Sequence, residues 1–322
     1  MNAPVTDFIP SPEHAAALNG VTALPQLGVI SASGEQAAQF LQGQLTQDVI
    51  LMPPGPARLA GFCSPKGRLL ASFVVCKRSP NDFWLVCSQD LLARTLKRLS
   101  MFMLRAKLTL RDASSDLTVY GVLGDTIETI ASGAYSISTN SQNNPGFLAP
   151  LPSADGIARA LWVAAADHPP PAGPAVTPAL WDFAAVRSGV ASVSAPVVEA
   201  FVPQMLNYES VDGISFKKGC YPGQEVVARS QFRGAIKRRA FVGQVSGPAQ
   251  AGQEVFSAAA PGQPVGLIAQ AAAVPDFLPG GGTAVIAALQ LAVAQATDLH
   301  VGTHDGPALG ALRMPYPLAE DI

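Results

Sequence analysis

The chain has 322 residues, of which 48% are hydrophobic and 14% charged, and its formal net charge is -2. This composition is typical of a globular protein that buries a substantial core, and the length predicts two or three domains. The small net charge excludes a global electrostatic field that would draw the protein onto nucleic acid or an anionic membrane.

The N-terminal segment and the cysteine usage favour a cytoplasmic protein. Residues 1–10 contain Asp7 and lack a basic region followed by an apolar one, which a secretory signal would have. The most apolar late stretch, residues 283–296, is interrupted by Gln290 and is too short to span a bilayer. Four cysteines without a Cys-x-x-Cys pair are typical of reduced thiols, and no spacing of cysteine and histidine predicts a metal site. We therefore expect no membrane segment and no bound metal.

The first part of the chain has the pattern of an α+β unit. A short strand over 28–31 leads into a helix that we expect Ser33 to cap, with Gln36 in the reciprocal capping position. After a Pro/Gly break, three segments rich in Leu, Val and Phe predict consecutive antiparallel strands, and a hairpin turn follows the first. Apolar residues at helical spacing then predict an amphipathic helix that packs on this sheet. The expected strands are 58–63, 69–77, 83–87 and 107–111, the turn is 64–67, and the helix is 89–104.

A second α+β unit and a β-rich C-terminal part follow. The second unit is predicted to comprise strands 117–123, near Tyr135 and 160–165, a helix over 126–131, and a Pro-rich connector over 168–174. A further helix is predicted to begin with Pro178 at its first position and to end at Gly189. Beyond Arg239, short alternating segments between Gly/Pro turns predict a small β-barrel, with its boundary near Lys237. Its expected strands are 240–245, 264–269, 284–289 and 299–302.

One segment, residues 216–229, concentrates residue types that packing does not require. Gly219 and Gly223 flank Cys220 and predict a tight turn that exposes the thiol, while Lys217 and Lys218 favour its thiolate form. We therefore expect Cys220 to be functional.

The alternative for any isolated cysteine is a small buried hydrophobe. We accept that interpretation for Cys63, Cys76 and Cys87, because each lies in a predicted strand among Phe, Val and Leu.

Two further features have two readings each. A downstream basic cluster is either a solvated face or an edge that binds phosphate or carboxylate, to which arginine is suited. Trp181, on the helix after Pro178, is either a core residue or a platform on which a heterocycle stacks. The cluster consists of Arg229, Arg233, Lys237, Arg238 and Arg239.

Residues 217–225, Lys-Lys-Gly-Cys-Tyr-Pro-Gly-Gln-Glu, resemble the signature of the YgfZ-type folate-binding proteins, and residues 40–48, 63–68 and 202–207 match that family in the same order. The family is similar to the aminomethyltransferase (T-protein) of the glycine-cleavage system. The resemblance implies an α+β fold with three subdomains in a ring: two ferredoxin-like subdomains within 1–236 and a C-terminal β-barrel over 237–322. It places tetrahydrofolate in the central opening.

The resemblance also implies a function. It predicts a folate-binding accessory protein, a binder rather than an enzyme, that supports assembly or repair of iron–sulfur proteins, including tRNA-modifying enzymes. The expected partners are folate and iron–sulfur client or assembly proteins, with a monomeric chain and no stable nucleic-acid binding. The alternative is a folate-dependent aminomethyl or one-carbon transferase, and direct tRNA binding ranks last.

Departures from the T-protein pattern weigh against that alternative. Ala71 and Ser72 stand where the transferases carry the acidic residue of catalysis, and Arg187 stands where they show a glutamate that holds the pterin. Trp181 matches a tryptophan of the folate site, and Leu27 falls where some members have another. The expected folate-binding residues are Trp181, Leu27, Arg187, Tyr221 and Arg229, and Cys220 is the expected functional thiol with Lys217, Gln224 and Glu225 around it.

Overall fold

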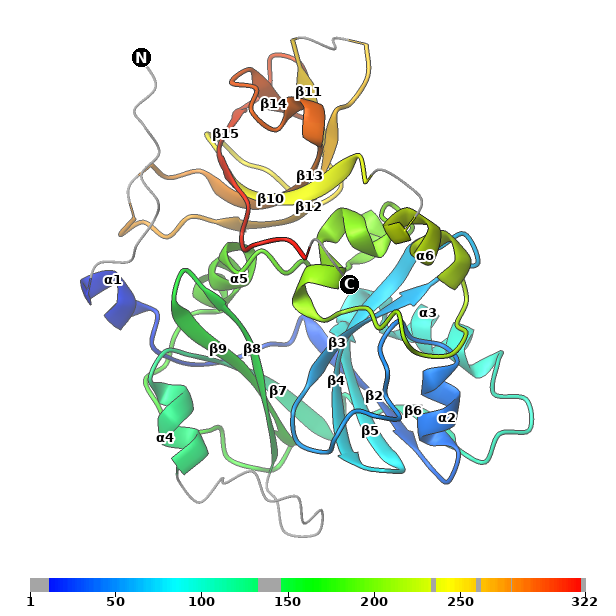
Figure 1. Ribbon diagram of the computed structural model, residues 1–322. Coiled ribbons are helices and arrows are strands. Elements are labelled where there is room, and N and C mark those ends of the chain that lie inside the picture. The colour runs from blue at the N-terminus through cyan, green and yellow to red at the C-terminus, as the bar shows by residue number, and fades with distance from the viewer. Residues whose placement is uncertain (1–11, 133–145, 233–235, 259–261, 279, 320–322) are drawn as a thin grey trace.

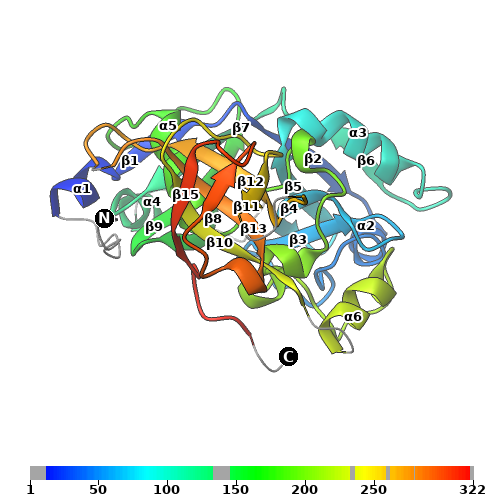
Figure 2. The same cartoon turned by 90° about the horizontal axis from the view of Figure 1, so that it is seen from above.

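The computed structural model describes residues 12–132, 146–232, 236–258, 262–278 and 280–319. Within these ranges, the strands form a five-stranded sheet, a four-stranded sheet and a closed six-stranded barrel. Figure 1 shows the barrel above the two sheets, which lie side by side beneath it. Seen from above, the barrel strands lie between α1 and α4 on one side and α2 and α6 on the other (Figure 2). The expected α+β fold with a C-terminal β-barrel is confirmed.

The five-stranded sheet, called the first sheet below, has the order β3-β4-β5-β2-β6. Its predicted strands and hairpin are confirmed, and all its pairings are antiparallel. The strands are β2 (Leu27–Ser33), β3 (Arg58–Cys63), β4 (Leu69–Ser79), β5 (Asp82–Ser88) and β6 (Thr109–Asp112), and the helices α2 (Ala37–Gln42) and α3 (Gln89–Ser100) pack beside them.

Two helix ends in this part differ from the expectation. Ser33 does not cap α2, because it remains in β2 and pairs with Asp82. The Gln36 side chain instead accepts a hydrogen bond from the Lys107 backbone N–H at 2.6 Å, so it ties the helix start to a distant loop. Helix α3 ends at Ser100 rather than at 104, and Leu104 has a positive φ of 39° that breaks helical geometry.

The four-stranded sheet, called the second sheet, has the order β1-β7-β9-β8. Its strands are β1 (Gly20–Ala23), β7 (Leu117–Leu123), β8 (Gly146–Ala154) and β9 (Ile157–Ala165), with α1 (Pro12–Ala17) and α4 (Thr126–Ser132) nearby. The expected strand near Tyr135 lies outside the described residues.

Strands β1 and β8 escaped the sequence analysis for physical reasons. Strand β1 is short and belongs to the second sheet although the chain then enters the first. Strand β8 contains Pro150 and Pro152, which argue against a strand, but β8 is the last strand of its sheet and an edge tolerates missing donors.

Helix α5 (Pro178–Arg187) contacts both the second sheet and the barrel. The Thr177 hydroxyl accepts a hydrogen bond from the Leu180 N–H at 3.4 Å, and Gly189, at φ 71°, follows the helix end as predicted. The helix contacts β1 and β8 of the second sheet and β12 and β13 of the barrel. It therefore lies between the second sheet and the barrel.

An irregular segment joins α5 to the barrel. It contains the 3₁₀-helices η1 (Ala195–Val197), η2 (Pro203–Leu206) and η3 (Tyr208–Val211), followed by α6 (Gln224–Phe232). One core cluster connects this segment to the first sheet and the barrel, since Tyr208, Phe73 of β4 and Ile286 of β13 belong to the same buried group.

The barrel closes in the order β10-β13-β12-β11-β14-β15. Its strands are β10 (Arg238–Val245), β11 (Glu254–Ser257), β12 (Gly266–Ala273), β13 (Thr283–Gln290), β14 (Leu299–Val301) and β15 (Ala308–Arg313), and the 3₁₀-helix η4 (Leu291–Val293) follows β13. Strands β11 and β15 were not predicted from the sequence. The division into domains at 236/237 stays a prediction, although every barrel strand follows residue 237.

The described helices include none that is both long and apolar enough to cross a membrane.

Candidate functional site

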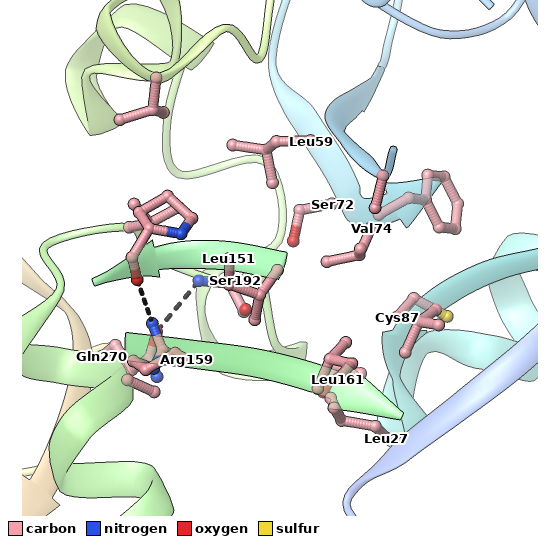
Figure 3. A pocket seen from close by; sticks show the side chains of 18 of the residues that line it. Leu27, Leu59, Ser72, Val74, Cys87, Leu151, Arg159, Leu161, Ser192 and Gln270 are labelled. Atoms are coloured by element: carbon pink, nitrogen blue, oxygen red, sulfur yellow. Dashed lines mark hydrogen bonds between the residues drawn. The ribbon is translucent and has the colours of Figure 1, made fainter. Parts of the chain in front are cut away.

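A cavity of about 380 Å³ lies where the two sheets, α5 and the barrel meet. Side chains from both sheets line its two sides, and Gln270 of the barrel strand β12 closes one end (Figure 3). We call it the central cavity. Its wall includes Leu27 of β2, Ser72 and Val74 of β4, Cys87 of β5, Leu151 of β8, Arg159 and Leu161 of β9, Trp181 and Asp182 of α5, and Arg58 and Asp212.

The wall is mostly apolar because strands of both sheets contribute apolar side chains to it. Leu27, Val74 and Leu161 come from three different strands, and Figure 3 shows them directed toward the same space. A pocket with apolar walls and a few polar groups is the usual form of a small-molecule site. Two of the five expected folate-binding residues, Leu27 and Trp181, line this cavity.

Trp181 is packed into the wall. Only 4% of its surface is exposed, and a Cβ at Gly121 of β7 would clash with its ring. The Arg159 guanidinium carbon lies 4.7 Å from the centre of the same ring, a cation–π distance. Trp181 is thus a core residue that also lines the cavity beside Arg159, and its use as a stacking platform stays a prediction.

Arg159 is the most buried cation of the cavity wall, at 6% exposure. Its Nη1 donates to the Pro152 carbonyl at 3.3 Å, but its buried Nε has no acceptor. Burial lowers the pKa of Arg159 to about 10, so the guanidinium remains charged at neutral pH.

The acidic position of the transferases is occupied by neutral side chains. Ala71 is fully buried in the core, whereas Ser72 lines the cavity and its hydroxyl accepts a hydrogen bond from the Val193 N–H at 2.8 Å. Asp182 is a carboxylate in the wall that the sequence analysis missed. Burial raises the pKa of Asp182, and a hydrogen bond from Gln26 at 3.0 Å opposes that rise.

Arg187 does not line the cavity. Its Nε is 2.6 Å from a carboxylate oxygen of Asp155, and the same carboxylate binds Arg313 of β15. Arg187 therefore joins α5 to the second sheet and the barrel. Tyr221 and Arg229 are likewise absent from the cavity wall.

Cys220 lies on a different surface, in the turn formed by residues 217–223, which we call the Cys220 turn. It is the exposed cysteine of the four, and Cys63, Cys76 and Cys87 are buried in strands, so these accessibility predictions are confirmed. Lys217 and Glu225 are exposed and Gln224 is half-buried at the start of α6. No member of this group lines the central cavity.

Lys218 has an unexpected role in the Cys220 turn. Its ammonium is buried and donates to the carbonyls of Gln42 and Leu45, at 2.7 Å for Leu45, and it lies 4.7 Å from the Tyr221 ring centre. Burial lowers the pKa of Lys218 to about 8, against the opposing effects of Asp48 and Cys220. Lys218 thus fastens the turn to the end of α2, within the matched segment 40–48.

The two glycines of the turn differ in whether the backbone there requires glycine. Gly223 has a φ of 78°, and a Cβ there would clash with the Ser64 carbonyl and the Gly67 backbone of the 64–67 hairpin. Gly219 lacks a positive φ, and a Cβ there would meet open space. The expectation that both glycines shape the turn is correct for Gly223 and wrong for Gly219.

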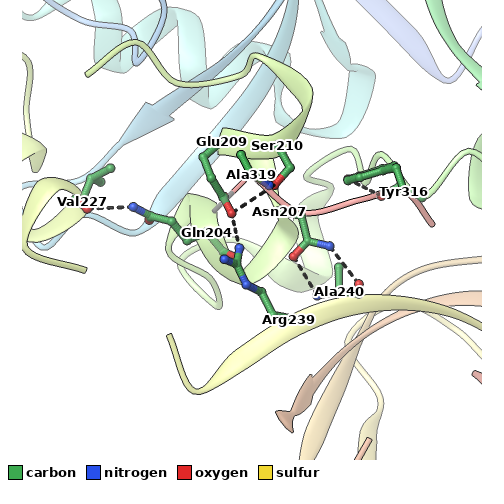
Figure 4. Close-up of polar contacts among 10 residues, drawn as sticks. Gln204, Asn207, Glu209, Ser210, Val227, Arg239, Ala240, Tyr316 and Ala319 are labelled. Carbon is green, nitrogen blue, oxygen red and sulfur yellow. Dashed lines mark hydrogen bonds and ion pairs between the residues drawn. The ribbon is translucent and has the colours of Figure 1, made fainter. Parts of the chain in front are cut away.

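The matched segment 202–207 holds these parts together (Figure 4). The Gln204 amide donates to the Val227 carbonyl of α6 at 2.7 Å. The Asn207 side chain exchanges two hydrogen bonds with the Ala240 backbone of β10, at 2.9 and 3.3 Å. The matched segments 40–48, 63–68 and 202–207 are therefore structural supports of the Cys220 turn and the barrel.

The basic cluster does not form one exposed edge. Arg239 is 7% exposed and forms an ion pair with the fully buried Glu209 carboxylate (Figure 4). Arg229 and Lys237 are exposed, Arg238 is half-buried, and Arg233 lies outside the described residues. Within the described ranges, no three His, Cys, Asp or Glu side chains gather as metal ligands would.

Comparison with known proteins agrees with this architecture. Residues 11–147 match the GCVT N-terminal domain. The chain is 29% identical over 220 residues to an uncharacterized protein of Haemophilus influenzae, covering 68% of this chain and 71% of that protein. It is also 29% identical to proteins named tRNA-modifying protein YgfZ from Colwellia psychrerythraea, over 68% of this chain and 69% of that one, and from Vibrio vulnificus, over 68% of each.

The fold has a counterpart among solved structures. The glycine cleavage system aminomethyltransferase T from Bartonella henselae superposes with a TM-score of 0.66 over 94% of this chain and 88% of that chain, at 12% identity. That likeness concerns the fold. Together with the matched domain, it makes the chain similar to the proteins named YgfZ in sequence and to the aminomethyltransferase T in fold.

Proposed function

We propose that the protein binds tetrahydrofolate or a one-carbon derivative in the central cavity and supports assembly or repair of iron–sulfur proteins, including tRNA-modifying enzymes. The observation that carries the first half is the cavity itself, which is enclosed by all three parts of an aminomethyltransferase-like fold. The second half rests on the similarity to proteins named tRNA-modifying protein YgfZ and on the exposed thiol of Cys220.

The cavity residues fit a folate. The apolar side chains of Leu27, Val74 and Leu161 suit the flat pterin and benzoyl rings. The Asp182 carboxylate offers an acceptor for the N–H donors of a pterin, a role for which Arg187 is chemically unsuited. The buried Arg159 is a cation whose Nε–H has no protein acceptor.

Calorimetric titration with tetrahydrofolate tests the binding half. We expect Leu27→Lys to abolish binding, because an ammonium would then project into the apolar wall. Leu180→Lys is the matched control, since Leu180 is also a partly buried leucine packed on the same core cluster but does not line the cavity. Equal affinity of the wild-type and Leu27→Lys proteins would exclude the central cavity as the site.

Complementation tests the other half. In a strain that lacks the protein, we expect Cys220→Ser to fail to restore the activity of dependent iron–sulfur enzymes, while Gly219→Ala, one residue away in open space, restores it. Full rescue by a folded Cys220→Ser protein would show that the thiol is dispensable.

Aminomethyl transfer is the alternative, and the cavity disfavours it. Ser72 faces the cavity where the transferases carry an acid, and its hydroxyl is already hydrogen bonded to the backbone. A serine cannot act as a carboxylate base at neutral pH. We expect no transfer to tetrahydrofolate when the protein partners of the glycine-cleavage system are supplied, and turnover above the uncatalysed rate would contradict this.

A further inference from the structure

Arg159 has an unusual environment for a buried cation. Its guanidinium carries five N–H donors, of which Nη1 uses one on the Pro152 carbonyl, and the buried Nε has no acceptor. Among the described residues, none of the ion pairs within 4.0 Å includes Arg159. The Trp181 ring, 4.7 Å from its guanidinium carbon, provides its cation–π partner.

Two other poorly exposed arginines, Arg239 and Arg187, are paired with carboxylates. Arg239, which is 7% exposed, binds the Glu209 carboxylate and the Gln204 carbonyl. Arg187, with a side chain 11% exposed, binds Asp155. A buried charge without a counter-ion costs several kcal/mol of folding free energy, so its retention calls for an anion that arrives from outside.

The location of Arg159 identifies where that anion would come from. The side chain lies in the wall of the central cavity, next to the edge strand β8 and opposite the apolar side chains of the first sheet (Figure 3). Arginine donors match the two oxygens of a carboxylate. A ligand with a flat apolar body and a carboxylate would satisfy both sides of the cavity at once.

We propose that Arg159 binds a carboxylate of the ligand in the central cavity, and that the site therefore selects acidic, aryl-linked ligands over neutral heterocycles. This rests on the proposed function, in which the ligand is tetrahydrofolate and the carboxylate belongs to its glutamyl tail. Trp181 acts as a positioning residue, because its ring holds the guanidinium.

Three probes separate the carboxylates from the pterin: tetrahydrofolate; 4-aminobenzoylglutamate, which carries the benzoyl ring and the carboxylates without the pterin; and 6-methyltetrahydropterin, which carries the pterin without a carboxylate. We expect Arg159→Met to weaken binding of the first two by at least about tenfold, the loss of one charge-assisted hydrogen bond. Binding of 6-methyltetrahydropterin should change less than about twofold. Arg159→Lys keeps the charge without the planar fork and should fall between wild type and Arg159→Met.

Arg58→Gln is the matched control. Arg58 also lines the cavity, but it is half exposed and paired with Asp212 at 3.2 Å, so its loss should leave all three affinities within about twofold. Variants are compared after circular dichroism confirms the wild-type fold. The proposal is overturned if Arg159→Met weakens the binding of all three probes equally, or if it leaves the binding of the two acidic probes unchanged. It is also overturned if Arg58→Gln weakens the binding of the acidic probes as much as Arg159→Met does.

The two fragment probes, 4-aminobenzoylglutamate and 6-methyltetrahydropterin, distinguish failure of this proposal from failure of the proposed function. If the wild-type protein binds neither tetrahydrofolate nor 6-methyltetrahydropterin, folate binding fails. If 4-aminobenzoylglutamate then still binds and its binding depends on Arg159, the carboxylate site is supported. If it does not bind, the carboxylate site is overturned as well.

Discussion

At the scale of single residues, the four cysteines show how position decides reactivity. Cys220 is exposed, whereas burial raises the pKa of Cys63 and Cys87 to about 12 and that of Cys76 further. The sequence predicted this division, because three cysteines lie in apolar strands and one lies in a turn. It did not predict that Cys87 also lines the central cavity.

Alkylation should therefore be selective. With iodoacetamide at pH 8, we expect the native protein to lose one thiol per chain and the Cys220→Ser variant to lose none, while both lose their remaining thiols in denaturant. Mass spectrometry counts the adducts. Cys220→Ser should change the free energy of unfolding by less than about 0.5 kcal/mol, and Cys76→Ser, which buries a hydroxyl, should cost about 1–3 kcal/mol. Rapid modification of a strand cysteine would contradict the assigned burial.

Lys218 gives a pH-dependent prediction. Its pKa is about 8 in the folded protein, below the ordinary lysine value of 10.5, so the unfolded chain holds more protons between these values. The contribution of Lys218 to the free energy of unfolding should therefore rise as the pH rises from about 8 to about 10.5, by roughly 1–3 kcal/mol. Urea denaturation of wild type and Lys218→Met across this range isolates it, because other groups titrate alike in both. A constant difference would refute the assignment.

At the scale of elements, alternation and helical spacing located β3, β4, β7 and α5 to within about two residues. They failed where a strand was short, as at β1 and β11, or contained proline at a sheet edge, as at β8. The start of α2 was wrong because the Gln36 side chain binds the Lys107 backbone, 71 residues away, instead of capping its own helix.

The Cys220 turn and the 64–67 hairpin make the element-scale prediction. Gly223→Ala should cost more than about 1 kcal/mol of unfolding free energy, because it combines a positive φ with a backbone clash. Gly219→Ala, four residues away in the same turn, should change it by less than about 0.5 kcal/mol. Urea denaturation measures both. Equal effects would mean that the two segments do not pack as described.

At the scale of the whole molecule, a buried ion pair joins the segment before α6 to the barrel. Glu209 is fully buried and binds Arg239 of β10 (Figure 4). Glu209→Leu leaves the guanidinium without its counter-ion and should cost about 3–5 kcal/mol of unfolding free energy. The double variant Glu209→Leu/Arg239→Met removes both charges and should lose less. A double variant less stable than Glu209→Leu would show that the pair is not coupled.

The sequence by itself determined the local structure: the strands and helices with clear periodicity, the C-terminal barrel, the burial of three cysteines and the exposure of Cys220. Local patterns report on neighbours a few residues apart, so they could place these features but could not assemble a site. Only the tertiary structure decided that Arg159 and Asp182 meet Leu27 and Gln270 in one cavity, that Arg187 turns away to Asp155, and that Lys218 reaches carbonyls 173 and 176 residues away. These contacts arise because the chain crosses between two sheets before closing the barrel, which brings distant residues to one centre and buries their charges there.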